Sequence, residues 1–163
     1  MELMDKIKIL KKIAREFNQA HITWSLGASM LLYFKGITTE FYDIDIMIVN
    51  EDAELVKRIM KSLSAELQPP KPNDKYQTKT FLEYVLEGVD VDIMGGFGIV
   101  YGGKTIDCSL HPDQIVEYLD LGNEKIPLQS VDLWCKYYEL MGRDNKVQMI
   151  KNATINNQSN ASL

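Results

Sequence analysis

The feature that most constrains the fold is an apolar segment, Phe41–Val49, that carries two aspartates one residue apart. Side chains at positions i and i+2 of a strand project to the same face, so Asp43 and Asp45 point together. Two carboxylates on one face of a buried strand are costly unless a cation or hydrogen bonds compensate them. The segment therefore predicts a strand with an apolar face and a charged site on the other face.

Size and composition predict one compact domain. The chain has 163 residues, of which 45% are hydrophobic, and this is enough for a substantial core. We expect a single domain over residues 1–151 and a polar, flexible tail over residues 152–163. The formal net charge of −5 disfavours binding to long nucleic acid. Two cysteines without a CxxC pair, and no signal-peptide pattern, favour a reduced cytoplasmic setting with no membrane contact.

Periodicity predicts an α+β fold, in which a small mixed β-sheet is flanked by helices. Strands are expected at residues 22–26, 41–49, 78–86 and 89–94, with one more short strand in the glycine-rich region that follows. Helices are expected at residues 2–19, 29–36, 53–63, 112–119, 131–140 and 144–150. Asp52 and Ser130 are predicted N-caps, and Gly142 a predicted helix stop.

A second acidic pair strengthens the prediction of a charged site. Asp90 and Asp92 share one face of the strand expected at residues 89–94. If this strand is a neighbour of the segment with Asp43 and Asp45, three or four carboxylates converge. Carboxylate oxygens are ligands that Mg²⁺ prefers, and Mg²⁺ sites keep positions open for phosphate oxygens. The pattern therefore indicates a metal and phosphate site, with a solvated strand face as the simpler alternative.

The turn Gly27-Ala28-Ser29 lies where a predicted strand meets a predicted helix. Free backbone N–H groups and the helix dipole favour anions at such a junction. Gly27 would let a phosphate approach the backbone, and Ser29 offers a hydroxyl donor. The turn is therefore the predicted phosphate-binding element of the site.

The order of these motifs resembles the nucleotidyltransferase superfamily of the DNA polymerase β type. The likeness rests on Leu26–Ser29, a helix, Gly36 and then Asp43–Ile46, and covers roughly residues 7–150. It is greatest to the small bacterial branch of minimal, antibiotic and AbiEii-like nucleotidyltransferases. The resemblance implies a nucleotidyltransferase-like mixed sheet flanked by helices.

The resemblance also implies roles for single residues. Gly27, Ala28 and Ser29 would hold the triphosphate, and Asp43, Asp45 and Asp92 would bind Mg²⁺ or Mn²⁺ and act in catalysis. Asp90 is the alternative third carboxylate. In Val131–Lys146, which resembles the closing helix of the family, Lys136 and Arg143 are candidate phosphate contacts. The chain departs from the family where an Arg-x-Thr element commonly precedes the first Asp pair, because Thr39–Tyr42 stand there.

The function implied is transfer of a nucleoside monophosphate from an NTP to a hydroxyl acceptor, with release of pyrophosphate. The acceptor would be a small molecule or a protein. The alternative is a catalytically weak or inactive nucleotidyltransferase-fold antitoxin or regulatory module that binds a protein partner, as the missing Arg-x-Thr element allows. A third alternative is an unrelated α+β domain with solvated acidic strand faces. A homodimer is also left open by the sequence.

Overall fold

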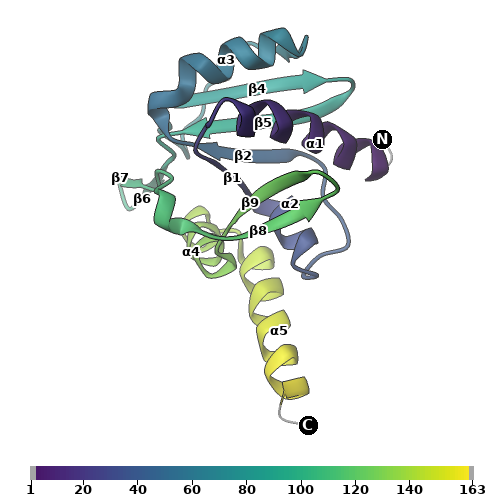
Figure 1. Ribbon diagram of the computed structural model, residues 1–163. Coiled ribbons are helices and arrows are strands. Elements are labelled where there is room, and N and C mark those ends of the chain that lie inside the picture. The colour runs from purple at the N-terminus through teal and green to yellow at the C-terminus, as the bar shows by residue number, and fades with distance from the viewer. Residues whose placement is uncertain (1–2, 162–163) are drawn as a thin grey trace.

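The computed structural model describes residues 3–161, with side-chain surroundings described for residues 3–156. A mixed seven-stranded sheet forms its centre, with strand order β3-β4-β5-β2-β1-β9-β8 (Figure 1). The strands are β1 Trp24–Gly27, β2 Ile44–Ile48, β3 Glu66–Leu67, β4 Thr80–Leu86, β5 Val89–Gly95, β8 Ile115–Leu121 and β9 Glu124–Gln129. A separate hairpin pairs β6 Gly98–Tyr101 with β7 Lys104–Asp107.

The described part of the chain contains five α-helices: α1 Leu3–Gln19, α2 Ala28–Phe34, α3 Ala53–Ser62, α4 Val131–Met141 and α5 Asp144–Ala161. Helices α1 and α3 contact each other, while α2 packs on β1 and β2 and also contacts α4. Figure 1 shows α1 and α3 on one side of the sheet, α2 and α4 on the other, and α5 extending away from the body. Among the described residues, no helix is long and apolar enough to cross a membrane.

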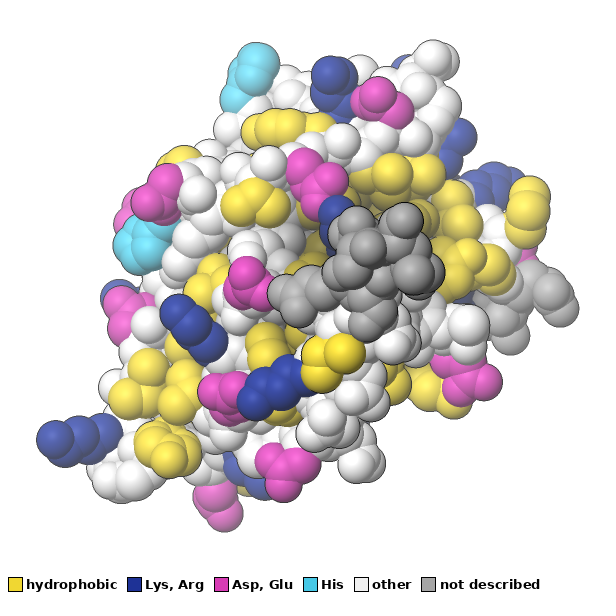
Figure 2. All heavy atoms as spheres, turned by 90° about the horizontal axis from the view of Figure 1, so that it is seen from below, with side chains coloured by type: hydrophobic (Ala, Val, Ile, Leu, Met, Phe, Trp, Pro, Cys, Tyr) yellow, Lys and Arg dark blue, Asp and Glu magenta, His cyan; other side chains and the backbone are white. Residues whose placement is uncertain are grey.

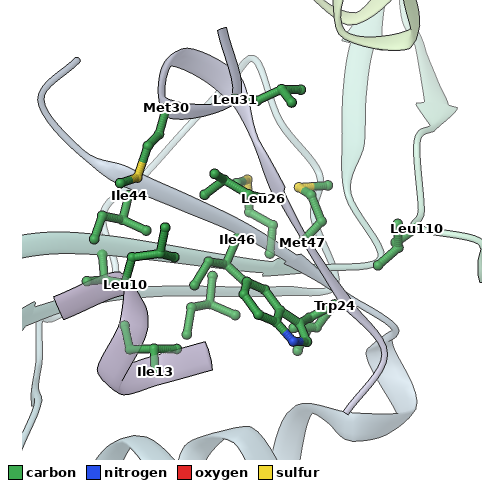
Figure 3. Close-up of a cluster of buried hydrophobic side chains, with 14 of the residues drawn as sticks. Leu10, Ile13, Trp24, Leu26, Met30, Leu31, Ile44, Ile46, Met47 and Leu110 are labelled. Atoms are coloured by element: carbon green, nitrogen blue, oxygen red, sulfur yellow. The ribbon is translucent and has the colours of Figure 1, made fainter. Parts of the chain in front are cut away.

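The core lies between α1 and the central strands. Leu10 and Ile13 of α1 are fully buried, and Figure 3 shows them beside Trp24 and Ile46 of the central strands. The alternation along β2 buries Ile44, Ile46 and Ile48 completely. The opposite face of β2 carries Asp45, which is only partly buried, and Met47, which is completely buried.

Most expected elements are confirmed. The tight turn at Glu87-Gly88, with positive φ angles of 49° and 81°, joins β4 to β5. The Ser130 side chain accepts a hydrogen bond from the N–H of Leu133 at 3.3 Å, so it caps α4. Gly142 ends α4 in the left-handed conformation, with φ 74°. The α+β fold expected from the sequence is therefore correct.

The structure corrects three local expectations. The helix expected at residues 112–119 is wrong, because only Pro112–Gln114 form a 3₁₀ turn and β8 follows at once. Asp52 precedes α3 without capping it, because its carboxylate accepts the N–H of Thr23 at 3.2 Å instead. The last helix, α5, runs to Ala161, well past the expected end at residue 150.

Candidate functional site

The sheet register brings the predicted acidic residues together. Strands β2 and β5 are parallel neighbours, and Asp45 lies directly opposite Asp92. On the other side of β2, Gly27 is the partner of Asp45, and beyond β5, Glu83 is the partner of Asp92. Directly opposed residues project to the same face. A row of four positions, Gly27, Asp45, Asp92 and Glu83, therefore crosses β1, β2, β5 and β4.

A cleft of about 300 Å³ opens over this row. Its floor is acidic, with Asp43, Asp45 and Asp92, and one wall comes from the turn with Ala28 and Ser29. The other lining residues are Tyr42, Tyr76, Phe81, Met94, Phe97, Trp134, Tyr138, Met141 and Arg143. The adjoining groove, of about 210 Å³, shares Asp43 and Asp92 and adds Gln68, Lys71, Glu83, Tyr84, Val85 and Asp90.

The carboxylates in the cleft hold protons more tightly than isolated aspartates do. Burial, followed by repulsion from Asp92 and Asp43, raises the pKa of Asp45 to about 8. Burial and the nearby acids raise the pKa of Asp92 to about 7, with Lys71 opposing the shift. The pKa of Asp43 is also raised, first by burial and then by Asp90, although Lys6 opposes this effect. The cleft therefore gathers carboxyl groups whose ionised forms the protein itself only partly neutralises, so that protons stay bound in the absence of a cation.

The donor set of this cluster fits a hard divalent cation. Several carboxylates at one cleft, with few neutralising cations, match the oxygen ligands that Mg²⁺ and Mn²⁺ prefer. Among residues 3–161, however, no group of three or more His, Cys, Asp or Glu side chains is already arranged to hold a metal ion. A bound cation would thus require rotation of carboxylate side chains that the cleft already brings together.

The turn before α2 has an unusual backbone. Ala28 adopts φ 52°, a left-handed conformation that favours glycine. Gly27 is needed for a different reason: a Cβ there would lie 2.7 Å from Cε2 of Trp134, which is closer than side chains pack. The indole of Trp134 therefore occupies the space that a side chain at position 27 would need, and this contact packs α4 against the end of β1.

Basic groups approach the turn from the start of α5. The Lys146 ammonium donates a hydrogen bond to the Ser29 hydroxyl oxygen at 3.2 Å. The Arg143 side chain lines the cleft, with its guanidinium 5.5 Å from the centre of the Tyr138 ring. Lys136, predicted from the sequence as a phosphate contact, is exposed on α4 and does not line the cleft. Ser29, Arg143 and Lys146 are therefore the polar groups that the structure brings together here.

Three aromatic rings form one wall of the cleft. The Tyr76 ring stacks on Phe97, with centroids 5.8 Å apart, and Phe97 stacks on Trp134 at 6.3 Å. Tyr76 comes from the proline-rich loop between β3 and β4, and is held there by a backbone bridge to Ile99 of β6. The wall is thus assembled from a loop, the connection between β5 and β6, and α4.

Sequence reasoning missed Lys146, Tyr76 and Glu83. Lys146 lies three residues after Arg143, and this spacing puts both side chains on one side of a helix. The sequence therefore allowed Lys146 to be identified together with Arg143. Glu83 follows from counting back from the Glu87-Gly88 turn, because Leu86 pairs with Val89 and therefore Glu83 with Asp92. No sequence pattern pointed to Tyr76, because the position of a loop residue depends on long-range contacts.

The segment Thr39–Tyr42, where the Arg-x-Thr element is absent, is supported by a lysine of α1. Glu40 is exposed and does not line the cleft. The Lys6 ammonium of α1 donates to the carbonyl of Phe41 at 3.0 Å and lies 5.7 Å from the centre of the Tyr42 ring. A lysine from α1 therefore supports this segment just before Asp43.

The fold matches those of solved nucleotidyltransferases. The Thermotoga maritima protein TM1012, assigned as a nucleotidyltransferase, is 22% identical, with a TM-score of 0.72 and 96% of each chain covered. The ANT(2'')-Ia protein, solved with adenylyl-2''-tobramycin, is 9% identical, with a TM-score of 0.63 and coverage of 92% of this chain and 90% of that one. The lincosamide antibiotic adenylyltransferase LnuA, solved with lincomycin, is 14% identical, with a TM-score of 0.59 and coverage of 93% and 97%.

The sequence matches no protein-family model and no curated protein sequence. The structural likeness extends over nearly the whole chain and agrees with the order of motifs seen in the sequence. The chain has the fold of the small nucleotidyltransferases.

Proposed function

We propose that this protein is a metal-dependent nucleotidyltransferase that moves a nucleoside monophosphate from an NTP to a hydroxyl acceptor. The observation that carries the proposal is the register that places Asp45 opposite Asp92 and next to Gly27, at the end of β1 where the turn to α2 begins. Carboxylates and a phosphate-binding turn on one cleft are what a Mg²⁺–triphosphate complex requires. The nucleotidyltransferase fold of the chain supports this assignment.

The two sides of the cleft suit the two parts of an NTP. Ser29, Lys146 and Arg143 would bind the triphosphate, together with the backbone of the turn from Gly27 to Ala28. The aromatic wall that ends in Tyr76 would stack against the nucleobase. Mg²⁺ held by Asp43, Asp45 and Asp92, with Asp90 as the alternative ligand, would neutralise phosphate charge.

The acceptor would enter from the acidic groove beside β4 and β5. Its hydroxyl oxygen forms a bond to the α-phosphorus, and the bond from that phosphorus to the oxygen of the leaving pyrophosphate breaks. The hydroxyl proton passes to the carboxylate of Asp92, which lies at the junction of cleft and groove. Because the fold neighbours include an antibiotic adenylyltransferase and a protein solved with an adenylylated antibiotic, a small-molecule alcohol is the first acceptor class to test.

Nucleotide binding tests the proposal directly. Calorimetric titration of the purified protein with each of the four NTPs and Mg²⁺ should give saturable binding that is abolished by EDTA. Asp45→Asn and Asp92→Asn should each weaken it at least about tenfold, the loss expected for a charged contact. Asp120→Asn, which removes an exposed carboxylate from the distant strand β8, is the matched control and should bind normally. Absence of binding by the unaltered protein would refute the proposal.

The alternative function, a nucleotidyltransferase-fold antitoxin or regulatory module with a protein partner, is favoured by one observation. Helix α5 extends from the body and exposes Ile155 to 58% (Figure 1). Figure 2, seen from the side on which α5 projects, shows hydrophobic side chains interspersed with charges of both signs. Under this alternative, Asp45→Asn would leave the biological activity intact, whereas an enzyme would lose it.

A further inference from the structure

Lys6 links helix α1 to the segment that leads into the acidic cleft. Its ammonium donates a hydrogen bond to the carbonyl oxygen of Phe41 at 3.0 Å, although the two residues lie 35 positions apart in the chain. The same nitrogen lies 5.1 Å from the centre of the Phe41 ring and 5.7 Å from the centre of the Tyr42 ring. Both distances allow cation–π attraction. One ammonium group therefore contacts the backbone and two aromatic rings of this segment.

The segment ends at a carboxylate of the proposed metal site. Phe41 is buried, with 6% exposed, whereas Tyr42 is 75% exposed and lines the cleft. Asp43 follows directly and also lines the cleft, but it lies one residue before β2 and outside the paired register of β2 and β5. Strand pairing therefore fixes Asp45 more firmly than Asp43. The contacts of Lys6 hold the two residues just before Asp43.

Lys6 acts on the cleft without being part of its lining. It is close enough to Asp43 to oppose the rise in the pKa of that carboxyl, which burial causes first and Asp90 second. The Mg²⁺ complex of a triphosphate is an anion, so a nearby ammonium does not oppose its binding. A carboxylate that is already held in place loses less conformational freedom when it binds a metal ion. A fixed segment before Asp43 therefore favours binding of the complex.

We propose that Lys6 is a positioning residue for the metal–triphosphate complex, because it holds the Phe41–Tyr42 segment and so keeps the Asp43 carboxylate at the cleft. Lys6 itself touches neither the metal ion nor the nucleotide. The role belongs to α1, a helix on the opposite side of the sheet from α2 and α4 (Figure 1). This inference rests on the proposed function, because the position of Asp43 matters only if the cleft binds a metal–nucleotide complex.

Two substitutions of Lys6 separate this role from a structural one. Lys6→Met keeps a long, helix-forming side chain but removes the ammonium. The dissociation constant for the Mg²⁺ complex of the best-bound NTP should then rise about tenfold, as expected for one lost hydrogen bond to a charged group. Lys6→Arg keeps a charged donor that also packs over aromatic rings, so its dissociation constant should stay within about twofold of the unaltered protein. Lys8→Met, at an exposed position of the same helix, is the matched control and should bind normally.

A double-variant cycle tests the route through Asp43. Lys6→Met should weaken binding little further once Asp43 is replaced by asparagine, because the lysine acts through that carboxylate. A lower melting temperature of Lys6→Met with unchanged affinity would show a purely structural contact, and additive losses with Asp43→Asn would show another route. Either result would overturn the inference while leaving the proposed function standing. If the unaltered protein binds none of the four NTPs, the proposed function fails and this inference with it.

Discussion

At the scale of single residues, the pair of carboxylates on β2 and β5 makes an unfavourable electrostatic contribution to the stability of the metal-free protein. Asp45 and Asp92 lie side by side in register, and burial with repulsion from neighbouring carboxylates raises both pKa values above the ordinary 3.8. Unfavourable interactions of this kind cluster at functional sites, where a bound ligand can relieve them. The cost is therefore best read as a property of the site, which a bound cation would offset.

Replacing Asp45 by asparagine should stabilise the metal-free protein at neutral and alkaline pH. A carboxyl with a higher pKa in the folded state binds more protons than it does unfolded, so stability falls as the pH rises from about 4 to 8. Asp45→Asn removes this loss, and its free energy of unfolding should exceed that of the unaltered protein by about 1–3 kcal/mol at pH 8. Urea unfolding in EDTA at pH 5 and pH 8 measures it. An equal loss of stability with pH in both proteins would contradict the assignment.

The left-handed backbone at Ala28 predicts a second stabilising change. A non-glycine residue at φ 52° loses about 1–2 kcal/mol, whereas glycine adds about 0.5–1 kcal/mol of chain entropy to the unfolded state. Ala28→Gly should therefore raise the free energy of unfolding by about 0.5–1 kcal/mol. Ala53, with φ −55°, is the control, and Ala53→Gly should instead destabilise the protein. Thermal unfolding of the two variants should thus shift in opposite directions.

At the scale of elements, the close contact between β1 and α4 is possible because residue 27 is a glycine. Gly27→Ala would push a Cβ into the Trp134 ring, so the variant should be about 1–3 kcal/mol less stable. Trp134→Phe, with a smaller ring, should relieve this clash, and the double variant should be less destabilised than the sum of the single changes. Chemical unfolding of the three variants measures the difference. Strict additivity would mean that Gly27 acts through its backbone and not through Trp134.

The elements also show what the sequence allowed to be predicted. The central strands β2 and β5 and helices α1 and α4 were predictable because apolar periodicity, capping residues and the Glu87-Gly88 turn agree with one another. The β8–β9 hairpin was missed, because His111-Pro112 suggested a helix start, while the turn at Gly122-Asn123 marks a hairpin. In β8 the alternation of exposed Val116 and Tyr118 with Leu119 and Leu121 is typical of an edge strand.

The site was predictable in part for a related reason. Asp43, Asp45 and Asp92 stand out because carboxylates in apolar strands are costly, so each carries a local signal. Tyr76 reaches the cleft only because its loop folds back on β6, and this placement depends on tertiary contacts. Local chemistry thus revealed the acidic floor, whereas the walls required the whole fold.

At the scale of the whole molecule, helix α5 divides into a packed start and a projecting remainder (Figure 1). Val147 and Ile150 are buried against the body, with 8% and 2% exposed. From Lys151 to Asn156 the side chains are exposed, apart from a half-buried Ala153. The buried part of α5 therefore ends near residue 150, and the rest of the helix contributes little to the core of the body.

Deleting residues 153–163 should therefore leave the body intact. The change removes almost no buried described side chain, so the free energy of unfolding should stay within about 0.5 kcal/mol of the full chain, and nucleotide affinity should not change. Ile150→Ala in the full chain is the control and should destabilise it by about 2–5 kcal/mol, because it leaves a cavity under the start of α5. Chemical unfolding and nucleotide titration of both proteins measure these effects. A truncated protein that unfolds or loses affinity would show that the end of α5 is part of the working domain, because the packed start of the helix would then be insufficient to hold Lys146 at Ser29.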